Sequence, residues 1–228
     1  MTSAADQVAA VTGYRFRDES LLAQALTHRS ANTRRHNERL EFLGDALLGF
    51  LIADRLYHVR SDDDEGDLSR LRASLVRGIT LAEIAADLEL GRCLTLGSGE
   101  LRSGGHRRRS ILADALEAIL GAIYLDGGLE PARAVVERLF AGRMDALPDA
   151  AHLKDPKTRL QEWLQARGLA LPRYELVDIT GEEHAQHFTV RCRLEQPSLS
   201  ATGEGSGRRH AEQSAALAVL ETLERGEP

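Results

Sequence analysis

The most constraining feature of this sequence is a helix-forming stretch that is apolar on one side and acidic on another. It covers residues 37–48, NERLEFLGDALL. Its leucines recur at the spacing of one helix face, and so do Glu38, Glu41 and Asp45. Because each helical residue turns about 100°, the three acids fall within a sector of about 60°. The leucines of such a helix need an apolar neighbour, and its acids need a separate explanation.

A second apolar stretch, residues 110–125, also carries acids. Asp114 and Glu117 are three residues apart and therefore share a helix face. Most of their neighbours are alanine or aliphatic residues, and a carboxylate among such residues is costly to bury unless something neutralises it. Neither these two acids nor Glu41 and Asp45 have a lysine or arginine four residues later.

These acids allow more than one interpretation. Spacing alone favours a solvated polar stripe, since most acids on helices are of that kind. If the two helices pack together, however, their carboxylates converge into a set of hard oxygen ligands that suits Mg²⁺ or Mn²⁺. A carboxylate-bridged di-iron protein is a third possibility. We disfavour it because its Glu-x-x-His pairs do not occur at these acids.

Length and composition exclude several classes of protein. The chain has 228 residues with a hydrophobic content of 43%, which predicts one or two ordinary globular domains. No apolar run reaches the roughly 18 residues of a membrane span, and the N-terminus lacks the pattern of a signal peptide. We therefore expect a cytoplasmic protein with no membrane partner. We also expect no organic cofactor. Cys93 and Cys192 are expected as small buried residues rather than as a disulfide or metal pair.

The first two thirds of the chain are predicted to be helical. The residues Asp18 to Ser20 look like the N-cap region of a helix that begins with LLAQALTHR. Further helices are expected at residues 37–57, 68–77, 79–88 and 110–125, and from Pro131 to about Gly142. The segment 97–110 is rich in glycine and arginine and is expected to be a loop. Residues 148–156 contain two prolines with little periodicity and are interpreted as a linker, as the segment LPDAAHLKDP suggests.

The last third has a different pattern. A helix is expected at residues 157–167, strands at 174–179, 188–194 and 199–202, and a closing helix at 208–223. The middle strand shows strict alternation of apolar and polar residues. The order α-β-β-β-α within about 70 residues predicts a small separate domain.

Several of these segments together resemble bacterial ribonuclease III. Residues 37–45, NERLEFLGD, look like the signature of that family. The similarity continues through DEGDLSR at 64–70, LVR at 75–77, GSGE at 97–100 and SILADALEA at 110–118. It covers essentially the whole chain. It implies an all-α catalytic and dimerisation domain in residues 1–147, a linker in 148–156, and an αβββα double-stranded-RNA-binding domain in 157–228.

The resemblance also implies an activity. It is that of a homodimeric, metal-dependent endonuclease that hydrolyses double-stranded RNA to 5′-phosphate and 3′-hydroxyl ends with two-nucleotide 3′ overhangs. Expected roles are the processing of ribosomal RNA precursors, transfer RNA and structured messenger RNA. The expected cofactor is Mg²⁺, for which Mn²⁺ can substitute. A non-cleaving RNA-binding protein on the same fold is the alternative, but it would have no use for the acids.

Roles for individual acids follow from the same resemblance. It places the metal ligands at Glu41, Asp114 and Glu117, and includes Asp45 in the metal site. Asp45 and Glu117 match the essential catalytic acids. Glu38 and Glu65 match acids that help to place substrate or the attacking water.

RNA contacts are implied for the last domain. The matching positions are Thr158, Gln161 and Glu162 on the first helix, His184 in the turn between the first two strands, and Arg208, Arg209 and His210 at the start of the last helix. This basic cluster is weak, because His210 occupies a position where lysine is frequent and Glu212 follows. From Lys154 onward, 10 lysines and arginines face 12 acids, a net charge of −2. We expect modest, strongly salt-dependent binding.

A few residues keep open assignments. Phe42 and Leu43 are expected to make core or dimer contacts rather than substrate contacts. The arginines 107–109 suit either RNA phosphates or a solvated loop. His28 is expected to have a structural polar role, although RNA contact is an alternative.

Overall fold

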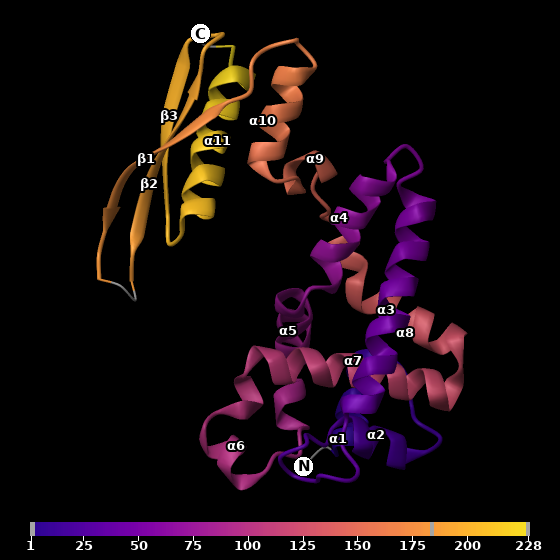
Figure 1. Ribbon diagram of the computed structural model, residues 1–228. Coiled ribbons are helices and arrows are strands. Elements are labelled where there is room, and N and C mark those ends of the chain that lie inside the picture. The colour runs from indigo at the N-terminus through magenta and orange to yellow at the C-terminus, as the bar shows by residue number, and fades with distance from the viewer. Residues whose placement is uncertain (1–2, 183–184, 227–228) are drawn as a thin grey trace. The chain divides into compact units, whose positions relative to one another are not determined.

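The computed structural model describes residues 3–182 and 185–226. The chain divides into two compact units, Met1–Ala150 and Ala151–Pro228 (Figure 1). Each unit has a hydrophobic core of its own. Within the described residues, no helix is both long enough and apolar enough to cross a membrane.

The first unit is built from helices, as the sequence predicts. They are α1 (Ala4–Thr12), α2 (Glu19–Ala25), α3 (Glu38–Val59), α4 (Glu65–Val76), α5 (Gly78–Asp87), η1 (Leu90–Arg92), α6 (Ser98–Arg102), η2 (Gly105–Arg107), α7 (Arg109–Gly127) and α8 (Leu129–Asp145). The long helices begin and end within a few residues of the expected positions.

Several short helices differ from the expectations. The segment expected to be a loop at 97–110 contains α6 and η2, and α1 was not anticipated at all. The expected linker contains a four-residue helix, α9 (Ala150–Leu153). Helices α6, η2 and α9 have five residues or fewer and are too short to show an apolar periodicity, so a pattern search cannot separate them from turns.

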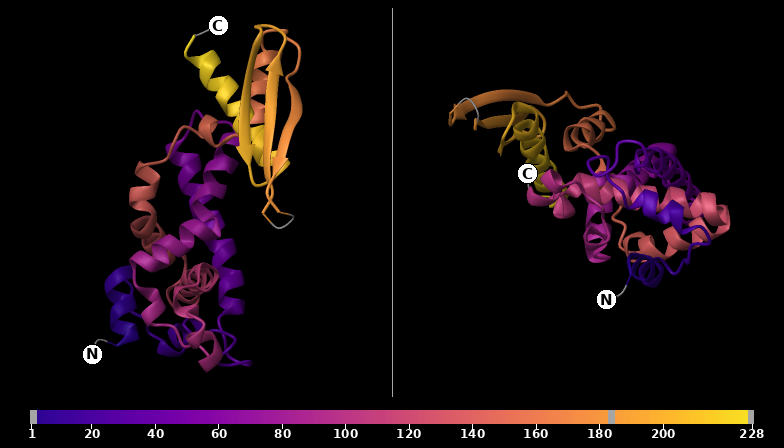
Figure 2. Two further views of the ribbon diagram at one scale, coloured as in Figure 1. Left: turned by 90° about the vertical axis from the view of Figure 1, so that its left-hand side faces the viewer. Right: turned by 90° about the horizontal axis from the view of Figure 1, so that it is seen from below.

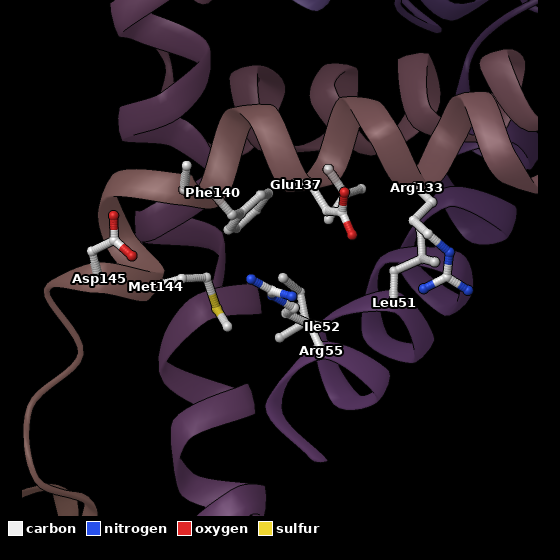
Figure 3. Close-up of a pocket in the computed structure, with 10 residues that line it drawn as sticks. Leu51, Ile52, Arg55, Arg133, Glu137, Phe140, Met144 and Asp145 are labelled. Atoms are coloured by element: carbon white, nitrogen blue, oxygen red, sulfur yellow. The ribbon is translucent and has the colours of Figure 1, made fainter. Parts of the chain in front are cut away.

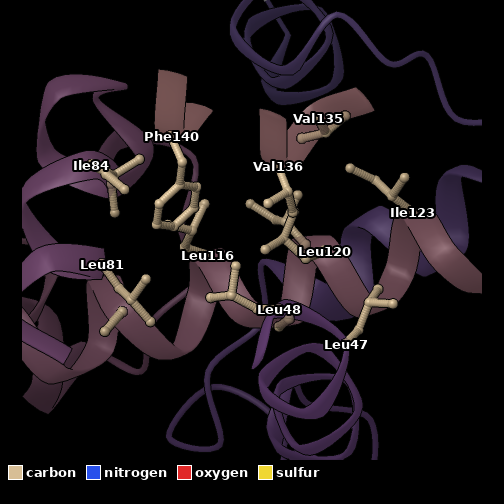
Figure 4. Close-up of a cluster of buried hydrophobic side chains, with 14 of the residues drawn as sticks. Leu47, Leu48, Leu81, Ile84, Leu116, Leu120, Ile123, Val135, Val136 and Phe140 are labelled. Atoms are coloured by element: carbon tan, nitrogen blue, oxygen red, sulfur yellow. The ribbon is translucent and has the colours of Figure 1, made fainter. Parts of the chain in front are cut away.

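The core of the first unit lies where α3, α5, α7 and α8 meet. Leu48 of α3, Leu81 of α5, Leu116 of α7 and Phe140 of α8 are fully buried there (Figure 4). Because α7 runs through the middle, eleven of its residues are buried. The acids of α7 therefore occur on the helix of the first unit that has the most buried residues, which limits where they can point.

Helices α3 and α7 approach each other unusually closely at two glycines. A Cβ atom at Gly44 would collide with the backbone oxygen of Glu117, and one at Gly121 would collide with the backbone oxygen of Leu40. Any larger residue at either position would push the helices apart. Gly44 lies between Glu41 and Asp45 in the sequence, so the close contact is also what brings the acids of the two helices together.

The second unit has the predicted αβββα order. It contains α10 (Pro156–Gln165), β1 (Arg173–Thr180), β2 (His187–Leu194), β3 (Leu199–Gly205) and α11 (Arg208–Glu224). The strands form an antiparallel sheet in the order β1-β2-β3, and both helices cover one face of it (Figure 2). Tyr174, Cys192 and Ala201 face each other across the three strands and point toward the helices. Cys93 and Cys192 are free and buried, as expected.

A cavity of about 160 Å³ lies between α3 and α8 (Figure 3). Its lining combines apolar side chains, such as Leu51 and Phe140, with Arg55 and Arg133. Arg133 is already engaged, because its Nη1 donates to Asp54 at 2.5 Å. None of the acids singled out by the sequence lines this cavity, so the candidate chemistry lies elsewhere.

The α3–α7 contact can be tested with a glycine substitution. We expect Gly44→Ala to lower the free energy of unfolding by about 3 kcal/mol, because the new methyl group meets backbone rather than a movable side chain. In a chain of this size that corresponds to a Tm lower by roughly 6 to 12 °C. Differential scanning calorimetry measures it.

Gly142→Ala is the matched control. Gly142 is an exposed helical residue of α8, and a Cβ atom there would have nothing within 4 Å. We expect this variant to be unchanged or stabilised by about 0.5 to 1 kcal/mol. Equal Tm values for the two variants would contradict the proposed role of Gly44.

Candidate active site

The carboxylates of Glu41, Asp114 and Glu117 converge between α3 and α7. One oxygen from each residue lies within 4.8 Å of the others. Oxygen ligands around an octahedral ion at about 2.1 Å are separated by up to about 4.2 Å, so small side-chain rotations would allow all three to hold one ion. The donor set is purely carboxylate, which suits a hard divalent cation. In the part of the chain that the structure describes, this is the one place where three or more such side chains come this close together.

The three acids are partly buried, and this raises their pKa values. Burial is the largest cause for each residue. For Glu117 the charges of Asp45, Glu41 and Asp114 add to it, and the pKa rises to about 8. The pKa of Asp114 is also raised by burial, but the charge interaction with His28 opposes part of this rise. The three carboxylates are hard to ionise at the same time, because their negative charges repel one another. A divalent cation between them would stabilise their ionised forms.

Two further acids lie at the exposed edge of this group. Asp45 is exposed, and its charge is the largest electrostatic contribution to the raised pKa of Glu117. Glu38 is also exposed and acts on both Glu41 and Asp114. Glu38 has a positive neighbour, because Nη1 of Arg29 lies 3.1 Å from its Oε1. The solvated-stripe interpretation therefore describes Asp45 and Glu38 but not the three partly buried acids.

Glu65 is not part of this group within one chain. It begins α4, accepts a hydrogen bond from Ser69 at 2.9 Å, and lines a hollow together with Tyr57. Tyr57 is sixteen residues beyond Glu41 on α3, which corresponds to about 24 Å along the helix. The structure thus brings Glu38, Glu41, Asp45, Asp114 and Glu117 together but leaves Glu65 apart.

The second unit presents its candidate RNA contacts on two helices. Thr158, Gln161 and Glu162 are exposed on α10, and Arg208, Arg209 and His210 are exposed in the first turn of α11. Glu162 is paired with Lys154 at 2.5 Å. His184 lies outside the described residues. In the described part of the chain, no side chain caps the N-terminus of α11, so its free backbone N–H groups remain available to an anion.

Comparison with known proteins decides the family. Residues 18–144 match the Ribonuclease-III-like family, and residues 156–223 match the double-stranded RNA binding motif. A Ribonuclease 3 from Alkalilimnicola ehrlichii is 58% identical over 212 residues, which cover 93% of this chain and 92% of that protein. One from Vibrio vulnificus is 53% identical over 226 residues, covering 99% of this chain and all of that protein. The chain belongs to the ribonuclease III family.

A solved structure agrees with this membership. The nuclease domain of ribonuclease III from Campylobacter jejuni is 44% identical and superposes with a TM-score of 0.60. It covers 61% of this chain, and the match covers 98% of that domain. The protein is accordingly an endoribonuclease of the ribonuclease III family, and its carboxylate group is compatible with the metal dependence expected of that family.

Sequence reasoning missed the two glycines that set the site. Gly44 and Gly121 are each four residues or fewer from a site acid, and glycine in the interior of a helix is unfavourable without a reason. That penalty is the signal that could have identified them. The proximity of Arg29 to Glu38 and of His28 to Asp114 was harder to predict, because both residues come from the segment between α2 and α3 and reach the acids only through the fold.

The raised pKa of Glu117 predicts how stability depends on pH without metal. The folded pKa of about 8 lies above the ordinary value of 4.5, so between these values the folded state binds more protons than the unfolded state. Stability therefore falls as pH rises through this window. We expect the Tm of the wild type in EDTA to fall by about 2 to 4 °C relative to Glu117→Gln between pH 5 and pH 8. This modest shift allows for the screening of a site that solvent reaches.

Adding 10 mM Mg²⁺ at pH 8 should reverse this difference, because the ion binds the ionised carboxylates of the folded state. The measurement is a thermal melt followed by circular dichroism. A Tm difference between the two proteins that is the same at all pH values would show that Glu117 ionises normally.

Proposed function

We propose that this protein is a Mg²⁺-dependent homodimeric endonuclease that cuts double-stranded RNA to 5′-phosphate and 3′-hydroxyl ends with two-nucleotide 3′ overhangs. The convergence of Glu41, Asp114 and Glu117 is the observation that supports this most directly. The expected substrates are ribosomal RNA precursors, transfer RNA and structured messenger RNA, and we expect the protein to act on them in the cytoplasm. Mn²⁺ should substitute for Mg²⁺ because it accepts the same oxygen donors.

The partly buried and the exposed carboxylates have different proposed roles. Glu41, Asp114 and Glu117 supply the oxygen atoms that hold the ion from the protein side. A bound divalent cation stabilises charge on a phosphoryl oxygen and makes water more acidic. Asp45, at the exposed edge, can accept a hydrogen bond from the attacking water at its carboxylate oxygen. The carboxylate of Glu38 lies at the same edge and is paired with Arg29.

A non-cleaving RNA-binding protein would not need this arrangement. Packing three carboxylates between α3 and α7 raises their pKa values and so lowers stability in the absence of an ion. This loss of stability has a reason if the three carboxylates serve catalysis. It has none if the protein only binds RNA. We therefore retain catalysis as the function of the first unit, and we assign RNA binding to the second.

Glu117→Gln tests the catalytic assignment. The substitution replaces one donor oxygen with an amide and keeps the side chain's size. We expect RNA affinity within about twofold of the wild type and cleavage slower by at least about a hundredfold, because a charged ligand of the metal is lost. A long RNA duplex incubated with each protein, with Mg²⁺ or with EDTA, provides the measurement on sequencing gels.

The product ends provide the sharper criterion. Wild-type protein with Mg²⁺ should give short duplexes with two-nucleotide 3′ overhangs, and EDTA should abolish them. Substantial cutting by the Glu117→Gln variant in Mg²⁺ would refute the assignment of this residue. Binding without cutting by the wild type under all metal conditions would favour the non-cleaving alternative.

Dimerisation is supported by an exposed apolar stripe on α3. Phe42, Phe50 and Tyr57 lie along one side of this helix, and Phe42 is 78% exposed, so it is not a core residue. Beside Phe42 is a groove lined by residues that include Leu21 and Leu125. The Campylobacter jejuni nuclease domain is described as having structural flexibility in a region involved in dimer formation. A protruding aromatic ring next to an apolar groove suits a symmetric contact between two copies.

Phe42→Asp tests this contact. We expect the variant to sediment as a monomer at micromolar concentration, where the wild type is dimeric, because a charge would be buried in the interface. Leu171→Asp, an exposed leucine of the second unit, is the control and should leave the dimer intact. A dimeric Phe42→Asp variant would place the interface on another surface.

A further inference from the structure

Two acids of the second unit lie among the cations where α10 meets α11. The two helices run side by side over one face of the sheet (Figures 1 and 2). Asp155 precedes α10 and Glu212 lies in the second turn of α11. Judged by charge alone, both acids should weaken the binding of a polyanion at this place.

Glu212 uses both of its oxygens to hold cations from two helices. Its Oε2 accepts a hydrogen bond from Lys157 Nζ at 2.5 Å, and its Oε1 accepts one from Arg208 Nε at 3.1 Å. The Glu212 side chain is only 14% exposed, whereas Arg208 is 62% exposed. The ion pairs with Lys157 and Arg208 lower the pKa of Glu212 against the effect of burial. The glutamate is therefore ionised and largely covered, and the arginine it holds faces solvent.

Asp155 makes a parallel set of contacts. It caps α10 by accepting from the Lys157 backbone N–H at 2.9 Å, and it accepts from the Gln213 side chain at 2.7 Å. Arg209 approaches the same carboxylate at 3.6 Å and is 82% exposed. Lys157 is further fixed by the Tyr174 ring, whose centroid lies 4.6 Å from Nζ. Each acid thus ties α11 to the start of α10.

The cations keep free hydrogen-bond donors despite these contacts. Glu212 engages Arg208 through Nε, which leaves the two terminal nitrogens of the guanidinium to other acceptors. Lys157 offers three donors and gives one to Glu212. Next to both, the N-terminus of α11 has no side-chain cap among the described residues. Fixed cations beside free backbone N–H groups form a surface that suits a phosphate.

We propose that Glu212 is a positioning residue for RNA binding, which holds Lys157 and Arg208 together as one phosphate-binding pair. This inference rests on the proposed function of the second unit as a binder of double-stranded RNA. It adds Lys157 to the RNA-contacting residues and reverses the expected effect of Glu212. A flexible lysine and a flexible arginine lose side-chain entropy on binding, and the carboxylate that fixes them beforehand removes part of that loss.

The proposal predicts an effect opposite to simple charge repulsion. Removing a negative charge next to RNA should tighten binding if charge alone matters. We expect Glu212→Ala instead to weaken binding of a 20-base-pair RNA duplex by five- to tenfold, and Glu212→Gln by two- to threefold. The whole 228-residue chain is titrated in EDTA, which prevents cleavage, and fluorescence anisotropy is recorded over a series of KCl concentrations. The salt dependence of log Kd should become shallower by about one for Glu212→Ala.

Glu221→Ala is the matched control. Glu221 lies on the same helix and pairs with Arg225 four residues away, as Glu212 pairs with Arg208, but at the opposite end of α11. This variant should bind RNA no more weakly than the wild type and keep its salt dependence. In a Lys157→Ala/Arg208→Ala background, Glu212→Ala should cause no further loss, because the residues it positions are absent.

The possible outcomes separate clearly. Equal or tighter binding by Glu212→Ala, or weaker binding with an unchanged salt dependence, would overturn the proposal. If Glu212→Ala is unfolded in a thermal melt, Glu212→Gln decides in its place, and tightening by that variant would overturn the proposal equally. Failure of the wild type itself to bind the duplex would refute the proposed function rather than the role of Glu212.

Discussion

The close backbone contact between α3 and α7 is the constraint on which the first unit depends. Gly44 and Gly121 remove the two side chains that would hold the helices apart, and the oxygens of Glu117 and Leu40 occupy that space. The same contact aligns the acidic side of α3 with the acids of α7. Packing and chemistry therefore have one origin here, and a substitution that opens the helix pair would harm stability and the site together.

That contact also brings carboxylates close enough to repel one another. Burial and mutual repulsion raise the pKa values of Glu41, Asp114 and Glu117, so the protein without metal holds its site at a cost in stability. The fold tolerates this cost because α7 is buried along most of its length and packs against α3, α5 and α8. The apolar helices hold the acids in place even without an ion. The site is therefore assembled before the ion arrives, and ion binding needs little rearrangement.

Much of this arrangement could be predicted from the sequence, and the reasons are specific. Helices α3 and α7 are long enough to show their apolar period, and Glu41, Asp114 and Glu117 lie on them at helical spacing, so their convergence follows once the helices pack. The middle strand of the second unit, β2, alternates cleanly between apolar and polar residues. The α6 helix has too few residues for a period. The distance of Glu65 from the other acids depends on where α4 packs along α3, which no local pattern encodes.

Charge counting was least informative in the second unit, because it adds up charges without locating them. The count treats Glu212 as a loss of positive potential, but its carboxylate is covered by Lys157 and Arg208 from two different helices. The spacing of Glu212 from Arg208 along one helix is visible in the sequence. The contact with Lys157 joins residues that are 55 positions apart and depends on how α10 packs against α11. For binding a regular RNA backbone, the placement of a few cations by partly buried acids can therefore matter more than the net charge of the unit that carries them.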